Sequence, residues 1–109
     1  MTVNDLIQAL SLTPLALPEG DREAEGVYIG DLLSWVMGRA QSGNVWLTIM
    51  SNLNIAAVAT LSDVSCILLC EGVTLDESVK ATAETKGINV LATNMTAYEA
   101  AKRLAELGL

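Results

Sequence analysis

The sequence predicts an α/β domain with a mainly parallel sheet of about four strands and helices on both faces. Three observations support this prediction. Short apolar runs alternate with amphipathic stretches, as expected of repeated strand–helix units. Polar turns containing glycine, asparagine or aspartate separate these stretches. The chain has 109 residues, which is enough for one domain with one modest core but too few for two domains.

We expect residues 1–109 to form a single domain, with an N-terminal helix and loop over 1–25 and a core over 26–109. Thr2 and Asp5 resemble a capping box, so a helix of about two turns should begin at Val3. Residues 12–14, which include a proline, should end it, and 15–17 follow as a brief extended piece. Residues 18–25 are mostly polar and predict an exposed loop or hairpin.

Residues 26–37 contain a short apolar strand over 27–29, a Gly30-Asp31 turn and then a helix. Asp31 is placed to cap that helix. The expected buried stripe of the helix consists of Leu32, Leu33, Val36, Met37 and Ala40. Trp35 lies partly off this stripe, so it is either an aromatic at the edge of the core or a subunit contact.

Residues 45–50 are apolar on both faces, which is typical of a central strand covered by helices on each side. Trp46 lies in this run and is, with Trp35, a candidate for a subunit interface. Asn54 should cap a short helix over 55–61, and residues 66–70 form the next apolar strand.

The last third of the chain predicts two helices and one strand. A largely polar helix over 77–86 should end at Gly87, and residues 88–93 form the fourth strand. Thr96 and Glu99 are a second capping-box pair, at the start of an alanine-rich final helix.

The two cysteines, Cys66 and Cys70, lie four residues apart in one apolar strand. They should point to the same face but lie too far apart for a disulfide, so we expect reduced, partly buried thiols and a cytoplasmic location. Residues 1–5 lack the basic and apolar regions of a signal peptide. No apolar run approaches the roughly 20 residues that a membrane span needs, so no membrane association is expected.

The charge and composition limit the classes of partner. The formal charge is −7, from 13 acidic and 6 basic residues, and this excess of acid disfavours nucleic acid. Hydrophobic residues make up 51% of the chain, which predicts a homodimer; an unusually apolar monomer core is the alternative. Histidine is absent, which removes the commonest general base and metal ligand. We therefore predict no catalytic residue, no metal site and no cofactor.

A ligand site is expected where the carboxyl ends of the parallel strands meet polar turns. The candidates in these four turns are Gly30, Asp31, Ser51, Asn52, Asn54, Glu71, Gly72, Thr93, Asn94 and Thr96. None of these turns contains lysine or arginine, and neither common phosphate-binding glycine motif occurs. Simple helix capping is the alternative role for Asp31, Asn54 and Thr96. A Mg²⁺ or acid–base pair of Asp31 and Glu71 is a further alternative.

Three segments carry a resemblance to a known family: residues 30–37, residues 54–59, and the run from Gly87 to Ala101 with its Gly-Ile-x-Val-Leu-x-Thr pattern. Over roughly three quarters of its length the chain resembles a DRTGG domain. The resemblance implies an α/β domain with an accessory role in dimerisation or regulation. Stand-alone members of this kind are similar to proteins encoded near iron hydrogenases and sensor kinases, which implies a protein partner in such a system.

The chain departs from the family pattern at one place. Cys70-Glu71-Gly72 stands where the family has Thr-Gly-Gly, and the Asp-Arg part is not recognisable, although Ser62-Asp63 lies nearby. An anion site built from that arginine and those glycine amides is therefore not expected here, because Glu71 would oppose an anion.

These observations together predict a non-catalytic homodimeric domain that regulates or scaffolds a partner and senses a small ligand at the strand-end turns. One alternative is a small-molecule or nucleotide sensor whose ligand is central to its action. An enzyme of phosphoryl or acyl transfer is less favoured, because the residues that such chemistry uses are missing.

Overall fold

A five-stranded sheet in the order β1-β5-β4-β3-β2 forms the centre of the computed structural model, which describes all residues 1–109. Its strands are β1 (Thr13–Ala16), β2 (Val27–Ile29), β3 (Val45–Thr48), β4 (Cys66–Leu69) and β5 (Val90–Ala92). Strands β2 to β5 are parallel, and β1 pairs antiparallel with β5. The predicted α/β class and mainly parallel sheet are confirmed, with one strand more than expected.

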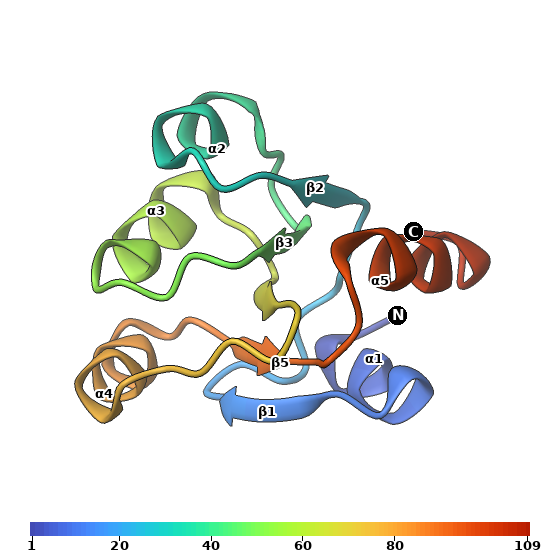
Figure 1. The fold of residues 1–109 in the computed structure, drawn as a ribbon, viewed down its shortest axis with the longest axis horizontal. Coiled ribbons are helices and arrows are strands. Elements are labelled where there is room, and N and C mark those ends of the chain that lie inside the picture. The colour runs from blue at the N-terminus through green and yellow to red at the C-terminus, as the bar shows by residue number, and fades with distance from the viewer.

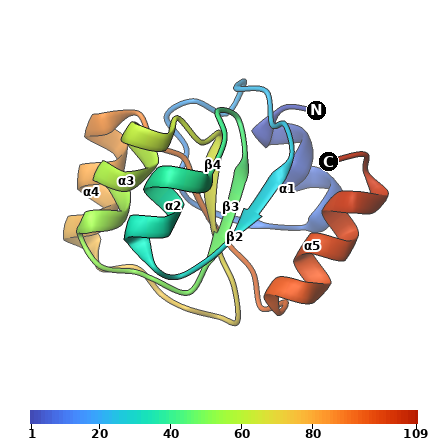
Figure 2. The same ribbon diagram turned by 90° about the horizontal axis from the view of Figure 1, so that it is seen from above.

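Five helices cover the two faces of the sheet. They are α1 (Val3–Leu10), α2 (Leu33–Arg39), α3 (Asn54–Ser62), α4 (Glu77–Lys86) and α5 (Ala97–Glu106). Strands β2 to β5 neighbour one another in chain order, so right-handed crossovers place α2, α3 and α4 on one face. Figures 1 and 2 show this layer, with α1 and α5 on the opposite face. The longest helices have 10 residues, and none has the length and apolar character needed to cross a bilayer.

The core is divided by the sheet into two clusters, one under each helix layer. Trp46, Ile67 and Leu69 point into the cluster beneath α2, α3 and α4. Leu47 and Leu68, which alternate with them, point into the cluster beneath α1 and α5. All residues of β3 and β4 are buried, as the two-sided apolar runs predicted.

Helix α1 belongs to the same core as the rest of the chain. Its Val3 and Leu6 are fully buried, and the predicted capping box between Thr2 and Asp5 is present. Strand β1 then adds to the edge of the sheet, where Pro14 is tolerated because an edge strand leaves some N–H positions unpaired. The sequence predicted only an extended piece here, since pairing with β5 depends on contacts nearly 80 positions away.

Helix α2 is shorter and more exposed than predicted. It begins at Leu33 with Leu32 as its N-cap residue, and Asp31 makes no capping bond to it. Within the expected buried stripe only Val36 is buried, while Leu32 is 57% exposed and Met37 47% exposed. The reason is position: α2 has seven residues and lies beside the edge strand β2, where one neighbouring helix, α3, packs against it.

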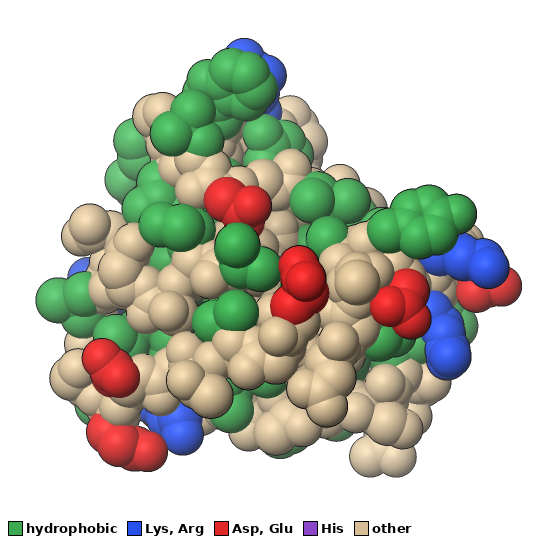
Figure 3. All heavy atoms as spheres, in the orientation of Figure 1, with side chains coloured by type: hydrophobic (Ala, Val, Ile, Leu, Met, Phe, Trp, Pro, Cys, Tyr) green, Lys and Arg blue, Asp and Glu red, His purple; other side chains and the backbone are tan.

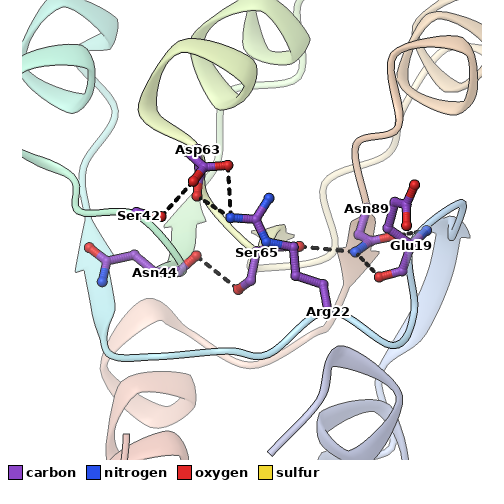
Figure 4. Close-up of polar contacts among 7 residues, drawn as sticks. All are labelled: Glu19, Arg22, Ser42, Asn44, Asp63, Ser65 and Asn89. Carbon is purple, nitrogen blue, oxygen red and sulfur yellow. Dashed lines mark hydrogen bonds and ion pairs between the residues drawn. The ribbon is translucent and has the colours of Figure 1, made fainter.

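The polar segment over 18–25 is a loop, as predicted, and its four acidic residues are exposed, but polar contacts hold it across the amino ends of the strands (Figure 4). The Arg22 guanidinium donates to the main-chain oxygen of Asp63 at 2.7 Å and pairs with its carboxylate at 2.8 Å. The buried side-chain amide of Asn89 donates to the main-chain oxygen of Glu19 at 2.8 Å and accepts from its N–H at 2.9 Å. Buried polar groups that satisfy one another in this way fix the path of the segment.

Candidate functional site

The loops that follow β2, β3, β4 and β5 gather along one edge of the molecule, at the bottom of Figure 2. This is the arrangement that parallel strands impose on their carboxyl ends. Asn54, one of the ten predicted ligand-binding residues, is the first residue of α3. The other nine lie in these four connections: Gly30 and Asp31 after β2; Ser51 and Asn52 after β3; Glu71 and Gly72 after β4; Thr93, Asn94 and Thr96 after β5. The structure divides them into two groups with different surroundings.

Asp31 joins the loops after β2 and β3. Its Oδ1 accepts a hydrogen bond from the Thr48 hydroxyl at 2.8 Å and another from the Ile49 N–H at 3.0 Å. The expected capping role is therefore wrong for Asp31, because its carboxylate is turned toward β3. No group of three or more His, Cys, Asp or Glu side chains that could hold a metal ion occurs in the structure.

Trp46 is fully buried on β3, so it cannot be the subunit contact that the sequence suggested. Its indole N–H donates to the main-chain oxygen of Gly30 at 2.9 Å, which fixes the end of β2 against β3. Gly30 itself donates to the main-chain oxygen of Leu47 at 3.1 Å. Both polar groups of Gly30 are used in holding the sheet together.

The capping role predicted for Asn54 is taken by Asn52. Asn54 is the first residue of α3, and its N–H donates to the side-chain Oδ1 of Asn52 at 2.9 Å. The expected cap at Asn54 is therefore wrong, and Asn52 satisfies the exposed N–H instead. Ser51 is partly buried beside them. Thr96 does form the predicted capping box with Glu99 at the start of α5.

Large apolar side chains are exposed on the first half of this edge. We call these residues, Ile29, Leu32, Trp35, Ile49 and Leu53, the strand-end apolar surface; each is between 46% and 57% exposed. Ile29 ends β2, Leu32, Ile49 and Leu53 lie in the connections after β2 and β3, and Trp35 is in the first turn of α2. These elements neighbour each other because β2 pairs with β3 and α2 packs on α3. Figure 3 shows several hydrophobic patches on this side of the molecule, most of them in the upper half near α2, with tan and red groups between them. Arg39 stacks on the Trp35 ring, 3.6 Å from its centroid.

The second half of the edge is formed by the loops after β4 and β5, which are bonded to each other. The N–H groups of Glu71 and Gly72 donate to the main-chain oxygens of Met95 and Thr93 at 2.9 and 3.0 Å. Both donors have positive φ, 60° for Glu71 and 73° for Gly72, and a side chain at Gly72 would meet Asn94 at 3.1 Å. Gly72, Thr93 and Asn94 are thereby brought together.

These three residues line a cavity of about 610 Å³ between the ends of β4 and β5, the start of β1 and the helices α4 and α5. Lys80 of α4 and Arg103 of α5 also line it. The sequence predicted a ligand site in four turns that contain no lysine or arginine. The two cations lie within helices α4 and α5, so the composition of the turns did not reveal them. No sequence pattern predicted that β1 would line the cavity.

One known protein family matches most of the chain. A model of the DRTGG domain matches residues 21–107. The chain belongs to the DRTGG domain family. The match begins a few residues before the resemblance read from the sequence, so the segment held by Arg22 is part of this DRTGG domain. No curated protein matches the sequence.

A solved structure has the same fold as this DRTGG domain. It is the crystal structure of the CBS and DRTGG domains of the regulatory region of Clostridium perfringens pyrophosphatase, complexed with activator, diadenosine tetraphosphate. The TM-score is 0.75 over 94% of this chain, with 14% sequence identity, so the likeness establishes the fold. The chain spans 45% of that protein's length.

The cysteines of this DRTGG domain are buried on the face of β4 beneath α1 and α5. Burial raises the pKa of Cys66 to about 12. Burial, and then the negative charges of Glu71 and Asp31, raise the pKa of Cys70 to about 11. Both thiols are therefore protonated near neutral pH and poorly nucleophilic.

We expect iodoacetamide at about pH 8 to leave both thiols of the folded protein unmodified, because only the thiolate reacts and neither thiol ionises at that pH. Intact-mass spectrometry measures the result. Protein unfolded in guanidinium is the control, since its thiols should titrate near the ordinary value of about 8.5 and react. Rapid alkylation of Cys66 or Cys70 in the folded protein would contradict this description of the core.

Proposed function

We propose that this DRTGG domain is a non-catalytic regulatory domain that pairs with a second copy of itself and responds to a small ligand at the strand ends. The observation that carries the proposal is the strand-end apolar surface. Five large apolar side chains, exposed at the end of β2, in the connections after β2 and β3 and in the first turn of α2, are costly to leave in water and are typical of an interaction site. Aromatic anchors such as Trp35 are enriched in the centres of such interfaces.

A second copy of the chain fits this surface because the surface carries few charges. Each chain carries a formal charge of −7, so two chains repel each other unless they meet where charge is sparse. Residues 26–54, from which the strand-end apolar surface is built, contain two charged side chains, Asp31 and Arg39, one of each sign, and Arg39 already stacks on Trp35. An isologous pair would therefore bury apolar area with little charge repulsion.

Regulation is supported by two findings. The DRTGG domain of similar fold lies in a regulatory region that was crystallised with its activator, and the cavity here offers a place for a small ligand. A sensor in which ligand binding itself is the main action is the second candidate, and the same cavity favours it. The family resemblance adds a protein partner in a hydrogenase or sensor-kinase system as the element that such a domain would control, inside the cytoplasm.

Leu32→Asp should weaken self-association at least about tenfold, because a carboxylate would be buried without a partner in the interface. Sedimentation velocity over a concentration series gives the dissociation constant. The matched control is Leu61→Asp, the same change at a site that is 73% exposed at the other end of α3. This control should associate as the unmodified protein does.

Equal dissociation constants for Leu32→Asp and the unmodified protein would exclude the strand-end apolar surface as the interface. Loss of association in Leu61→Asp alone would move the interface to the far end of α3. Circular dichroism of each variant checks that the fold is retained, which we expect because both leucines are exposed in the single chain.

A further inference from the structure

The cavity at the ends of β4 and β5 differs in charge from the rest of the molecule. Its 14 lining residues include two basic side chains, Lys80 and Arg103, and no acidic one; Glu71, whose charge would oppose an anion, precedes Gly72 but does not line the cavity. The whole chain has 13 acidic residues and only 6 basic ones, so the positive charge of this lining is opposite in sign to the net charge of the protein. We propose that this cavity binds a small organic phosphate, with Arg103 and Lys80 holding the phosphoryl group. This assignment names the ligand class for the ligand response proposed above and rests on that response.

The two cations reach the cavity from opposite faces of the sheet. Lys80 follows Val79, which is buried in the cluster beneath α2, α3 and α4. Arg103 precedes Leu104, which is buried in the cluster beneath α1 and α5. The cavity lies at the β1–β5 end of the sheet, where both helix layers meet the same opening. Two cations held on separate rigid elements suit an anion with several oxygens, because each cation can approach a different oxygen.

Several hydrogen-bond donors of the lining are not used within the protein. The Arg103 guanidinium takes part in none of the three ion pairs and donates no side-chain hydrogen bond. The main-chain N–H groups of Thr74 and Asn94 also have no acceptor in the protein. Lys80 contacts Glu77 at 3.3 Å, but Glu77 is 90% exposed, and such surface pairs are weak enough to be exchanged for a ligand.

The remainder of the lining is suited to an apolar body attached to the phosphate. Leu15, Val73, Leu75 and Met95 contribute apolar wall, and the volume of about 610 Å³ falls within the usual range for small-molecule sites. A small ligand is favoured over a nucleic acid, because the net charge of −7 repels a polyanion while two local cations can still hold one phosphate.

The test is a titration of ¹⁵N-labelled full-length protein, followed by amide chemical shifts, with inorganic phosphate, AMP and adenosine as probes. Sodium chloride at matched ionic strength controls for screening. We expect phosphate and AMP to shift the amides of Thr74 and Asn94, AMP at lower concentration than phosphate. Arg103→Gln should weaken AMP binding about tenfold, because it removes a charge-assisted donor pair. Lys102→Gln makes the same charge change on the adjacent residue outside the cavity and should leave the affinity within about twofold.

Three results would overturn the proposal: no shifts at Thr74 and Asn94 with phosphate or AMP, shifts that sodium chloride reproduces, or equal AMP affinity in Arg103→Gln and the unmodified protein. Adenosine binding as tightly as AMP would show a site for neutral ligands; the phosphate assignment would then be wrong while the proposed ligand response would stand. Self-association is measured separately by sedimentation, so failure of the dimer leaves this result interpretable.

Discussion

Trp46→Ala is expected to destabilise the protein by about 3–5 kcal/mol, which is among the largest costs of a single core truncation. The side chain is fully buried between β3 and the helices α2 and α3. The substitution leaves a cavity and also removes the indole N–H that donates to Gly30 at 2.9 Å. Small domains have a total stability of about 5–15 kcal/mol, so the variant should lose a large fraction of its stability. Urea unfolding followed by circular dichroism measures the change.

Trp46→Phe separates packing from hydrogen bonding at the same position. It keeps an aromatic ring in the core but loses the donor, so we expect a cost of about 1–3 kcal/mol, smaller than that of alanine. If Trp46→Ala unfolded at the same urea concentration as the unmodified protein, Trp46 would not be part of the core, and the arrangement of β2 on β3 described above would be wrong.

Asn89→Ala should cost about 2–4 kcal/mol, because it leaves one buried and two partly buried hydrogen-bond partners unsatisfied at once. The side-chain amide is 1% exposed and makes three hydrogen bonds, two to Glu19 and one to the main-chain oxygen of Ser65 at 3.0 Å (Figure 4). Its loss releases Glu19 from the amino end of β5, while Arg22 still holds the segment to Asp63. Amide hydrogen exchange should therefore accelerate in this segment before it does in β3 and β4.

The matched control for Asn89→Ala is Asn94→Ala. Asn94 is exposed, and its side chain makes no hydrogen bond in the protein, so the expected change in stability is within about 0.5 kcal/mol. Equal urea midpoints for Asn89→Ala and Asn94→Ala would contradict the role assigned to Asn89. Unchanged amide hydrogen exchange over 18–25 in Asn89→Ala would contradict the proposal that Asn89 attaches this segment to the strands.

The strands and their order of appearance could be predicted because local patterns specify them. The two-sided apolar runs at 45–50 and 66–70 became the fully buried strands β3 and β4. The capping boxes at Thr2 and Thr96 are also local and were predicted correctly. Strand β1 was missed as a member of the sheet, since four residues with a proline give a weak local signal and pair only with the distant β5.

The candidate site was predictable in position but not in detail. Parallel topology requires the four polar turns to share one edge, and they do. The roles of Asp31 and Asn54 depended on where α2 and α3 begin, and a shift of one or two residues changed both. Lys80 and Arg103 could not be placed, because their meeting depends on which helices flank β1 and β5 in space.

The central claim is that the strand-end apolar surface pairs two copies of this DRTGG domain. Native mass spectrometry of the freshly purified, unmodified protein tests it most directly. We predict a species of twice the 11.5 kDa chain mass, with any retained small ligand visible as added mass. A monomer of 11.5 kDa at every concentration would contradict the claim, and the exposure of Trp35 and its neighbours would then need another partner to explain it.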